Sequence, residues 1–133
     1  MLQPLRFDNE TLYALDQTRL PGEIVWLALK DHFDTAQAIS NLSIRGAPAI
    51  GIAAAYGIVL GARSVHSSTM TDFCSQLDAV INILTSTRPT ARNLFQAAEY
   101  MRQIATASLT PADALGHLTA GAKKLHSDQT TQD

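Results

Sequence analysis

The stretch that decides the fold of this chain runs from residue 44 to residue 57 and reads Ile44-Arg45-Gly46-Ala47-Pro48-Ala49-Ile50-Gly51-Ile52-Ala53-Ala54-Ala55-Tyr56-Gly57. The seventeen residues from Gly46 to Ala62 carry no charge. Proline suits the first turn of a helix, because its missing N–H would have no intrahelical partner there. Pro48 therefore predicts the start of a helix that ends near Ala62 or Arg63.

This uncharged helix is interpreted as buried within the protein and not as a membrane span. A transmembrane helix needs about 20 predominantly apolar residues, whereas this stretch is shorter and consists largely of alanine and glycine. Gly57 and Gly61 have the GxxxG spacing, which lets helices approach one another closely. We therefore expect the helix to pack against other elements of the fold.

Arg45 and Gly46 precede this helix and predict an anion site at its N-terminus. The first N–H groups of a helix lack intrahelical acceptors and lie at the positive end of the macrodipole, so helix N-termini commonly bind phosphate. A guanidinium group binds phosphate through two parallel hydrogen bonds, and glycine lets the backbone approach a ligand closely. The alternative is that Arg45 is a surface residue, or that it binds carbonyl groups at the end of the preceding helix.

Arg88 is the second candidate for anion binding. It directly precedes Pro89 in a predicted connection between two helices, and Thr90 and the N–H groups after it would add donors. The alternative is a solvated loop arginine. Arg92 lies within the next predicted helix, where a solvent-facing role is expected.

The N-terminal part of the chain predicts a small antiparallel sheet of three strands between about residues 3 and 29. Leu5 and Phe7 alternate with charged residues, and Leu12–Asp16 is the expected returning strand. Pro21-Gly22 indicates a turn before Ile24–Leu27, which is rich in β-branched and aromatic residues.

Five helices are expected between about residues 31 and 126, giving an α+β fold in a single domain over residues 1–133. Besides the central helix, they cover 31–41, 71–86, a segment capped by Thr90, and a segment with Thr110 as cap and Pro111 in the first position. The expected apolar faces are Phe33, Ala36 and Ile39 in the first; Phe73, Leu77, Val80, Ile81 and Leu84 in the third; Leu94, Ala97, Met101 and Ile104 in the fourth; and Leu115, Leu118 and Leu125 in the fifth. The polar residues 127–133 are expected to form no further element.

Composition limits the classes of function. A hydrophobic content of 46% with 17% charged residues is typical of a folded globular protein. The net charge of −2 gives no reason to expect nucleic acid or a membrane surface as a partner. Cys74 is the single cysteine, so no intramolecular disulfide is expected. Because residues 1–16 also lack the apolar run of a signal peptide, we expect a cytoplasmic protein.

No sequence pattern for metal or nucleotide chemistry is present. The four histidines show no His-Glu-x-x-His spacing, and the glycines after Gly46 do not match the dinucleotide fingerprint. We expect neither a metal nor a cofactor. Cys74 lies near a helix start, which can activate a thiol, but a structural role as a small buried residue is the favoured interpretation.

Three motifs together resemble the N-terminal part of the 5-methylthioribose-1-phosphate isomerase family. They are Leu15-Asp16-Gln17-Thr18-Arg19-Leu20-Pro21, then Ile44-Arg45-Gly46-Ala47-Pro48-Ala49-Ile50-Gly51 with Ala54-Ala55-Tyr56-Gly57, then Thr87-Arg88-Pro89-Thr90-Ala91 with Asn93-Leu94. The superfamily also contains ribose-1,5-bisphosphate isomerases and the regulatory subunits of a eukaryotic translation-initiation exchange factor. The resemblance extends from about Leu5 to the last predicted helix.

The resemblance implies an aldose–ketose isomerase of methionine salvage that acts without a redox cofactor or metal, with a sugar phosphate as substrate. By motif, Arg45, Gly46, Ala47 and Arg88 would contact this substrate. It also implies a homodimer in the complete protein. The family's catalytic cysteine and aspartate lie in a C-terminal Rossmann-like domain that has no counterpart here, so no catalytic residue is assigned to this chain. Cys74 does not match the family's cysteine motif, and Arg92 stands where an apolar residue is usual.

Two alternatives to the isomerase remain open. A non-catalytic regulatory or sugar-phosphate-sensing subunit of the same superfamily would carry a similar domain. An unrelated helical interaction domain would bind no sugar phosphate at all. The intact Arg-Gly-Ala-Pro-Ala-Ile-Gly run favours the enzyme.

Overall fold

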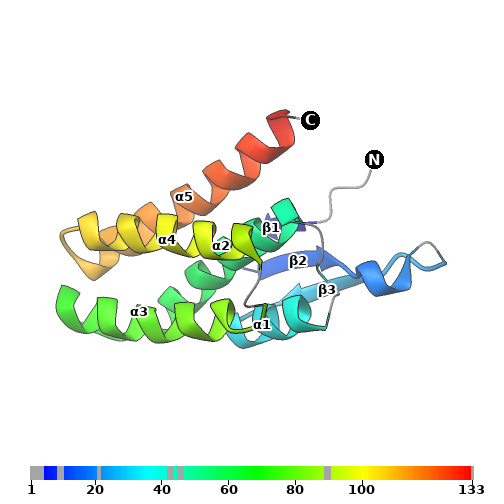
Figure 1. Ribbon diagram of the computed structural model, residues 1–133. Helices are drawn as coiled ribbons and strands as arrows, with labels where there is room; N and C mark the ends of the chain where they lie inside the picture. Colours follow the sequence, from blue (N-terminus) through cyan, green and yellow to red (C-terminus); the bar gives the residue numbers. More distant parts are fainter. Residues whose placement is uncertain are drawn as a thin grey trace.

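The protein is an α+β domain with a small sheet followed by five helices, as the sequence predicts (Figure 1). This computed structural model describes residues 5–8, 11–20, 22–41, 44, 47–88 and 91–132. The elements are β1 (Leu5–Asp8), β2 (Thr11–Leu15), the 3-10 helix η1 (Gln17–Arg19), β3 (Trp26–Leu29), α1 (His32–Ser40), α2 (Ala47–Arg63), α3 (Met70–Thr85), α4 (Arg92–Ala107) and α5 (Pro111–Gln132).

The sheet is antiparallel with the strand order β1-β2-β3. Phe7 pairs with Leu12, and Leu12 pairs with Leu29, so the apolar side chains of the three strands share one face. This face packs against α1 and α2, and Leu12 is fully buried. The opposite face carries the side chains of Arg6 and Tyr13, which are also paired across the strands.

The third strand begins two residues later than predicted. Residues 24–27 were expected to form it, but Ile24 is 63% exposed and the strand runs from Trp26 to Leu29. The connection before this strand contains a 3-10 helix, which the sequence pattern does not predict. The side chain of Asp16 accepts a hydrogen bond from the N–H of Thr18 and starts this helix, which extends the connection between the strands.

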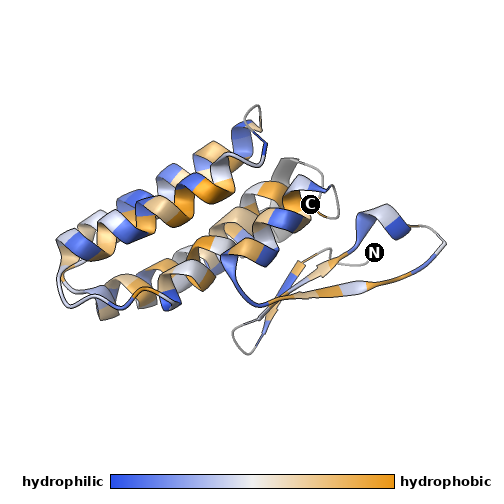
Figure 2. Ribbon diagram, turned by 90° about the horizontal axis from the view of Figure 1, so that it is seen from below, coloured by the Kyte–Doolittle hydropathy of each residue, from blue (hydrophilic) through white to orange (hydrophobic). Residues whose placement is uncertain are grey.

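Helix α2 is the centre of the molecule. It contacts α1, α3, α4 and α5 as well as β1 and β2, and Figure 1 shows it crossing between the other helices. Every residue from 50 to 62 is buried. A helix that is covered on all sides has no solvent-facing stripe for charged residues, which explains why this stretch of sequence is uncharged. Figure 2 shows hydrophobic residues on the inner surfaces of the surrounding helices.

The GxxxG spacing on α2 marks close contacts with two helices, as expected. A Cβ atom added to Gly57 would lie 2.9 Å from Cγ2 of Thr35 on α1. A Cβ atom on Gly61 would lie 2.9 Å from Cγ2 of Val80 on α3 and 3.1 Å from Nδ1 of His32 on α1. These separations are shorter than ordinary van der Waals contact, so α1 and α3 can approach α2 only at glycine.

The predicted face of α3 is confirmed, and that of α1 is partly wrong. All five apolar residues expected on α3 are buried: Phe73, Leu77, Val80, Ile81 and Leu84. On α1, Ala36 and Ile39 are buried as expected, but Phe33 is 60% exposed. The buried side of α1 is completed by His32 and Thr35, because the helix meets α2 at its small residues and is rotated away from Phe33.

Helix α4 starts without the predicted cap. Its N-cap position belongs to Ala91, which forms no side-chain capping bond, while Thr90 lies outside the described residues. The expected face of α4 is otherwise confirmed, since Leu94, Ala97 and Met101 are buried and Ile104 is partly buried against the core.

Helix α5 starts as predicted but is longer than expected. The N–H of Asp113 donates to Oγ1 of Thr110 at 3.1 Å, which confirms the cap. The helix then continues to Gln132, past the predicted end near residue 126. Its polar end is held by a 2.9 Å hydrogen bond between the hydroxyl of Tyr56 on α2 and Nδ1 of His126. Hydrophobic periodicity does not predict this polar last part of α5, because a hydrogen bond to α2 and not an apolar face holds it in place.

No helix in the described part of the chain combines the length and apolar character needed to cross a membrane.

Replacing Gly61 by alanine is expected to lower the free energy of unfolding by about 1–3 kcal/mol, because the new methyl group overpacks the contact with Val80. Urea denaturation followed by circular dichroism measures this loss. Gly116→Ala on α5 is the control: an added Cβ there meets nothing within 4 Å, so stability should rise by about 0.5–1 kcal/mol. The loss in the double variant Gly61→Ala/Val80→Ala should be smaller than the sum of the losses in the two single variants, because the smaller side chain relieves the overpacking. Strict additivity of the two changes would contradict the close contact.

The free energy of unfolding is expected to fall as the pH drops below the pKa of an ordinary histidine. Burial lowers the pKa of His126 in the folded state, so the unfolded chain takes up the proton more readily. The contribution of His126 is therefore fully present above the unfolded-state pKa of about 6.5 and is lost as the pH falls through the folded-state pKa.

Urea denaturation between about pH 5 and 8 tests this expectation. His126→Gln should flatten the profile in part, because burial also lowers the pKa of His32. Tyr56→Phe should lower stability by about 0.5–1.5 kcal/mol, through loss of one hydrogen bond, but should keep the pH dependence. A profile unchanged by His126→Gln would disprove the assignment.

Candidate functional site

The anion site is predicted at the start of α2, where the structure describes the residues on either side of Arg45 and Gly46. Ile44 is buried, and its N–H donates to the carbonyl of Ala38 at 3.1 Å. Ala47 is the first residue of α2, so Pro48 belongs to the first turn, as predicted. Arg45 and Gly46 lie outside the described residues, so their contacts with a ligand remain a prediction.

The N-terminus of α4 lies beside this end of α2. A Cβ atom added to Gly51, the fifth residue of α2, would lie 3.0 Å from the carbonyl oxygen of Asn93, the second residue of α4. This separation is tighter than almost all contacts of real Cβ atoms, so a side chain here would require the backbone of α4 to shift by a few tenths of an ångström. The connection that carries Arg88 leads directly into this junction, and the carbonyl of Arg88 accepts a 2.9 Å hydrogen bond from the N–H of Ala91.

The other three helices neutralise their own N-termini. Each has an oxygen-bearing cap whose side chain accepts the N–H of an aspartate three residues later: Asp31 with Asp34, Thr69 with Asp72, and Thr110 with Asp113. The cap satisfies a free N–H group, and the aspartate opposes the helix dipole.

The first turns of α2 and α4 lack this arrangement. Neither helix has an acidic residue in its first turn, and Ala91 at the N-cap of α4 offers no side-chain acceptor. The positive ends of two neighbouring helices therefore face the same region without an acidic side chain from their own first turns. This is the arrangement that binds an anion.

Arg88 is half-buried in the α3–α4 connection and forms no ion pair with any described residue. Its charge is therefore not neutralised by a carboxylate in the part of the chain that the structure describes. Arg92, by contrast, is exposed at the first position of α4. Arg88 and Ala47 are thus carried by the two segments that meet at the α2–α4 junction.

The remaining candidates offer no catalytic or metal constellation. Cys74 is half-buried on α3 and packs against the hydrophobic core, as in the structural interpretation. The described residues contain no group of three or more metal-ligating side chains.

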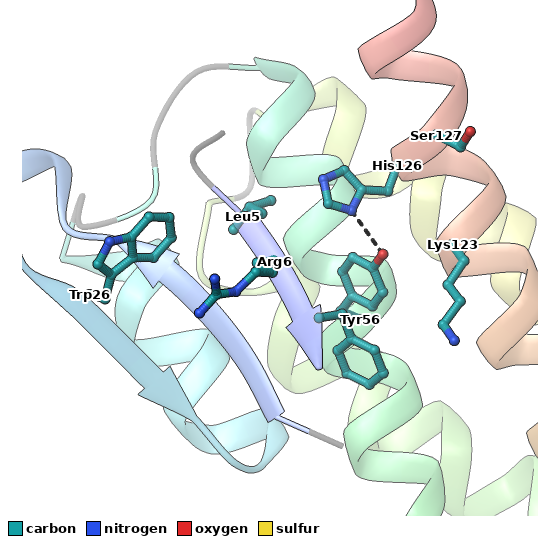
Figure 3. A pocket seen from close by; sticks show the side chains of 8 residues that line it. Leu5, Arg6, Trp26, Tyr56, Lys123, His126 and Ser127 are labelled. Carbon is teal, nitrogen blue, oxygen red and sulfur yellow. Dashed lines mark hydrogen bonds between the residues drawn. The ribbon is translucent and has the colours of Figure 1, made fainter. Parts of the chain in front are cut away.

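The molecule also contains a groove that was not anticipated from the sequence. It is an open groove of about 620 Å³ between β1 and α5, with Tyr56 of α2 at its base (Figure 3). We call it the β1–α5 groove, and its lining residues are Leu5, Arg6, Phe7, Trp26, Tyr56, Lys123, His126 and Ser127. One sequence feature could have indicated it: Tyr56 carries the only polar side-chain atom between Gly46 and Ala62.

Aromatic contacts build the base of this groove. The ring of Phe7 stacks on that of Tyr56 at 4.6 Å between centroids, and the ring of His126 stands edge-on to Tyr56 at 5.5 Å. Burial raises the pKa of Tyr56 to about 12, while burial lowers the pKa of His126. Both groups are therefore neutral at neutral pH, and the hydrogen bond between them joins two uncharged side chains.

Comparison with known proteins identifies the family. The sequence profile described as the initiation factor 2 subunit family matches residues 43–133. Methylthioribose-1-phosphate isomerase of Alkalilimnicola ehrlichii is 45% identical over 130 residues, which are 98% of this chain and 37% of that protein. The protein of the same name from Geotalea uraniireducens is 52% identical over 98 residues, 74% of this chain and 28% of that protein.

Two solved structures share the fold. The 5-methylthioribose 1-phosphate isomerase from Pyrococcus horikoshii OT3 superposes with a TM-score of 0.90 at 28% identity, covering 96% of this chain and 36% of that one. The translation initiation factor eIF-2B subunit delta from A. fulgidus has a TM-score of 0.88 at 32% identity, covering 96% and 37%.

The chain thus spans about a third of the length of these relatives. The resemblance read from the three sequence motifs is confirmed. Because the family profile covers more than half of the sequence, this chain belongs to the initiation factor 2 subunit family.

Proposed function

We propose that this chain is the N-terminal part of an S-methyl-5-thioribose-1-phosphate isomerase, which converts methylthioribose 1-phosphate to methylthioribulose 1-phosphate in methionine salvage. In this proposal Arg45, Gly46, Ala47 and Arg88 hold the substrate. The complete protein acts as a cytoplasmic homodimer without a redox cofactor or metal.

The observation that carries the proposal is the pair of neighbouring helix N-termini at the α2–α4 junction. Both first turns lack an acidic residue, whereas α1, α3 and α5 each carry one. Arg88, which has no carboxylate partner among the described residues, leads into the same junction. Free N–H donors and a guanidinium group together match the phosphate of a sugar phosphate.

Anchoring the phosphate has a clear use in this reaction. The phosphate of the substrate is attached to the anomeric carbon, where it blocks ordinary opening of the sugar ring. The isomerisation then moves hydrogen from C2 to C1 while the phosphate stays in place. Fixing the phosphate positions both carbons for the groups that transfer the proton, and positioning supplies much of an enzyme's rate advantage.

The proton-transfer groups themselves belong to another part of the protein in this proposal. The family resemblance implies that these groups are a cysteine and an aspartate of a C-terminal Rossmann-like domain. Cys74 is not that cysteine, because it lies on α3 and packs against the core. This chain therefore supplies substrate contacts and no catalytic residue.

A regulatory subunit of the same superfamily is the alternative. The likeness to the eIF-2B subunit delta favours it, since the TM-score of 0.88 nearly equals that of the isomerase structure. The fold therefore does not separate the two functions. Sequence identity of 45% to an isomerase over nearly the whole chain supports the enzyme. If the downstream sequence contained neither the cysteine nor the aspartate, the regulatory function would be the one supported.

Arg88→Gln in the full-length protein is expected to raise the Kd for methylthioribose 1-phosphate about 10- to 100-fold. A charge-assisted hydrogen bond to phosphate contributes about 1.5–3 kcal/mol, which gives this range. Isothermal titration calorimetry measures the change. Arg45→Gln should have a similar effect, because both guanidinium groups contact the same phosphate.

Arg92→Gln is the matched control for Arg88→Gln. It removes the same charge four residues later, from an exposed position at the start of α4, so a change of about twofold or less is expected from long-range electrostatics. Equal losses from both variants would indicate a general field and not a phosphate contact. Unchanged binding in Arg45→Gln and Arg88→Gln would support a helical interaction domain instead.

The 133-residue chain alone is expected to show no turnover of methylthioribose 1-phosphate, because it lacks the proton-transfer groups. A coupled assay or NMR detection of methylthioribulose 1-phosphate tests this. Turnover above the rate without protein would sink the assignment of catalysis to another domain, whatever the outcome of the binding experiments.

A further inference from the structure

Helix α5 is packed into the domain over its first turns and is joined to α2 by a polar contact further along. Ala114, Leu118 and Ala122 are fully buried, whereas His126 is half-buried. The ring of His126 contacts Tyr56 of α2 through a 2.9 Å hydrogen bond at Nδ1 and stands edge-on to it at 5.5 Å between centroids (Figure 3). We call this pair the Tyr56–His126 contact, and it ties the later turns of α5 to the central helix.

Packing alone does not account for a tyrosine at position 56. Tyr56 is 2% exposed, and the ring of Phe7 stacks on its ring at 4.6 Å between centroids. A phenylalanine would offer the same ring to Phe7 without a hydroxyl that has to be satisfied inside the protein. The hydroxyl finds its partner on α5, seventy residues later in the chain. Its specific contribution is therefore the link between α2 and α5.

This link determines the direction in which α5 leaves the domain. By the helical rise, α5 extends about 15 Å from Ala122 to Gln132, so a tilt of about 5° moves its end by about 1 Å. Helix α2, which holds Tyr56, is enclosed by four helices and two strands, and in the proposed function its first turn binds the phosphate. The Tyr56–His126 contact thus sets the end of α5 relative to the phosphate site through one rigid element.

We propose that Tyr56 and His126 are positioning residues of the isomerase, which fix α5, and through it the domain that follows, relative to the phosphate site at the α2–α4 junction. This inference rests on the proposed function, in which the chain continues beyond α5 into the domain that carries the proton-transfer groups. Neither residue touches the substrate. A misplacement of about 1 Å caused by a distant change can lower the rate of a reaction about 100-fold.

Steady-state kinetics of the full-length protein separate positioning from binding. Tyr56→Phe and His126→Ala are expected to lower kcat for methylthioribose 1-phosphate about tenfold or more, because the proton-transfer groups lose their alignment with the substrate. KM should change by about threefold or less, because the phosphate contacts at the α2–α4 junction remain. Arg88→Gln removes one of those contacts and should raise KM about tenfold or more.

His117 offers a matched control near the start of α5. Its Nδ1 lies 3.0 Å from Oγ of Ser108, so it too joins α5 to a neighbouring hydroxyl, nine residues before His126. His117→Ala should leave kcat unchanged, because the later turns of α5 keep their direction. Thermal unfolding curves check that each variant is folded at the assay temperature.

His126→Asn is the conservative variant. The side-chain amide of asparagine reaches about as far as Nδ1 of histidine, and its oxygen can accept the hydroxyl proton of Tyr56. It should restore most of the kcat that His126→Ala loses. A role of His126 in filling space alone predicts no such recovery.

Three results would overturn the inference. They are an unchanged kcat in both Tyr56→Phe and His126→Ala, an equal loss of kcat in His117→Ala, and no recovery in His126→Asn. Failure of the proposed function gives a different result: the wild-type full-length protein would then show no turnover of methylthioribose 1-phosphate, which would remove the isomerase assignment and this inference together. Normal turnover in every Tyr56 and His126 variant would overturn the positioning role and leave the isomerase assignment intact.

Discussion

Burial of α2 on every side is the constraint on which the rest of the structure depends. Thirteen consecutive residues of this helix, from 50 to 62, are buried, so small or apolar residues are favoured at each position. Two neighbours approach only because Gly57 and Gly61 have no side chain. Such a helix can offer a ligand little along its length, and its backbone N–H groups are free only in its first turn. Recognition by α2 is therefore confined largely to its ends, and the N-terminal end is the one suited to anions.

The N-termini of α2 and α4 differ from those of the other helices in how their positive charge is balanced. Two positive helix ends placed side by side repel each other unless an anion lies between them. In α1, α3 and α5 a local aspartate relieves the charge at the cost of occupying the helix end. In α2 and α4 the first turn leaves that position open. Two helix ends without a local acid are less stable than capped ones, and under the proposed function this cost leaves room for the phosphate, a trade that is common at functional sites.

Local patterns allowed much of this fold to be predicted, and long-range contacts decided the rest. The Thr110 cap and the apolar stripe of α3 depend on neighbours within one helix, so periodicity and capping rules predict them. The exposure of Phe33 depends on how α1 meets α2, which no local pattern encodes. The site divides in the same way: the Arg45 and Arg88 motifs are legible in the sequence, but the pairing of two unneutralised helix ends appears only when α2 and α4 are placed together. The groove joins residues near positions 6, 56 and 123, and it had no sequence signature beyond Tyr56.

Helix α2 also determines how the α2–α4 junction and the β1–α5 groove can affect each other. Two regions of a protein influence one another only if a change at one alters a structure that the other senses. The element common to both is α2, which is enclosed by four helices and two strands. A shift of α2 would disturb close contacts on several sides at once, and packed interiors resist small displacements. Its hold on Tyr56 is equally firm, because that side chain is 2% exposed and is bound to His126. Helix α2 therefore forms a rigid partition between the α2–α4 junction and the β1–α5 groove.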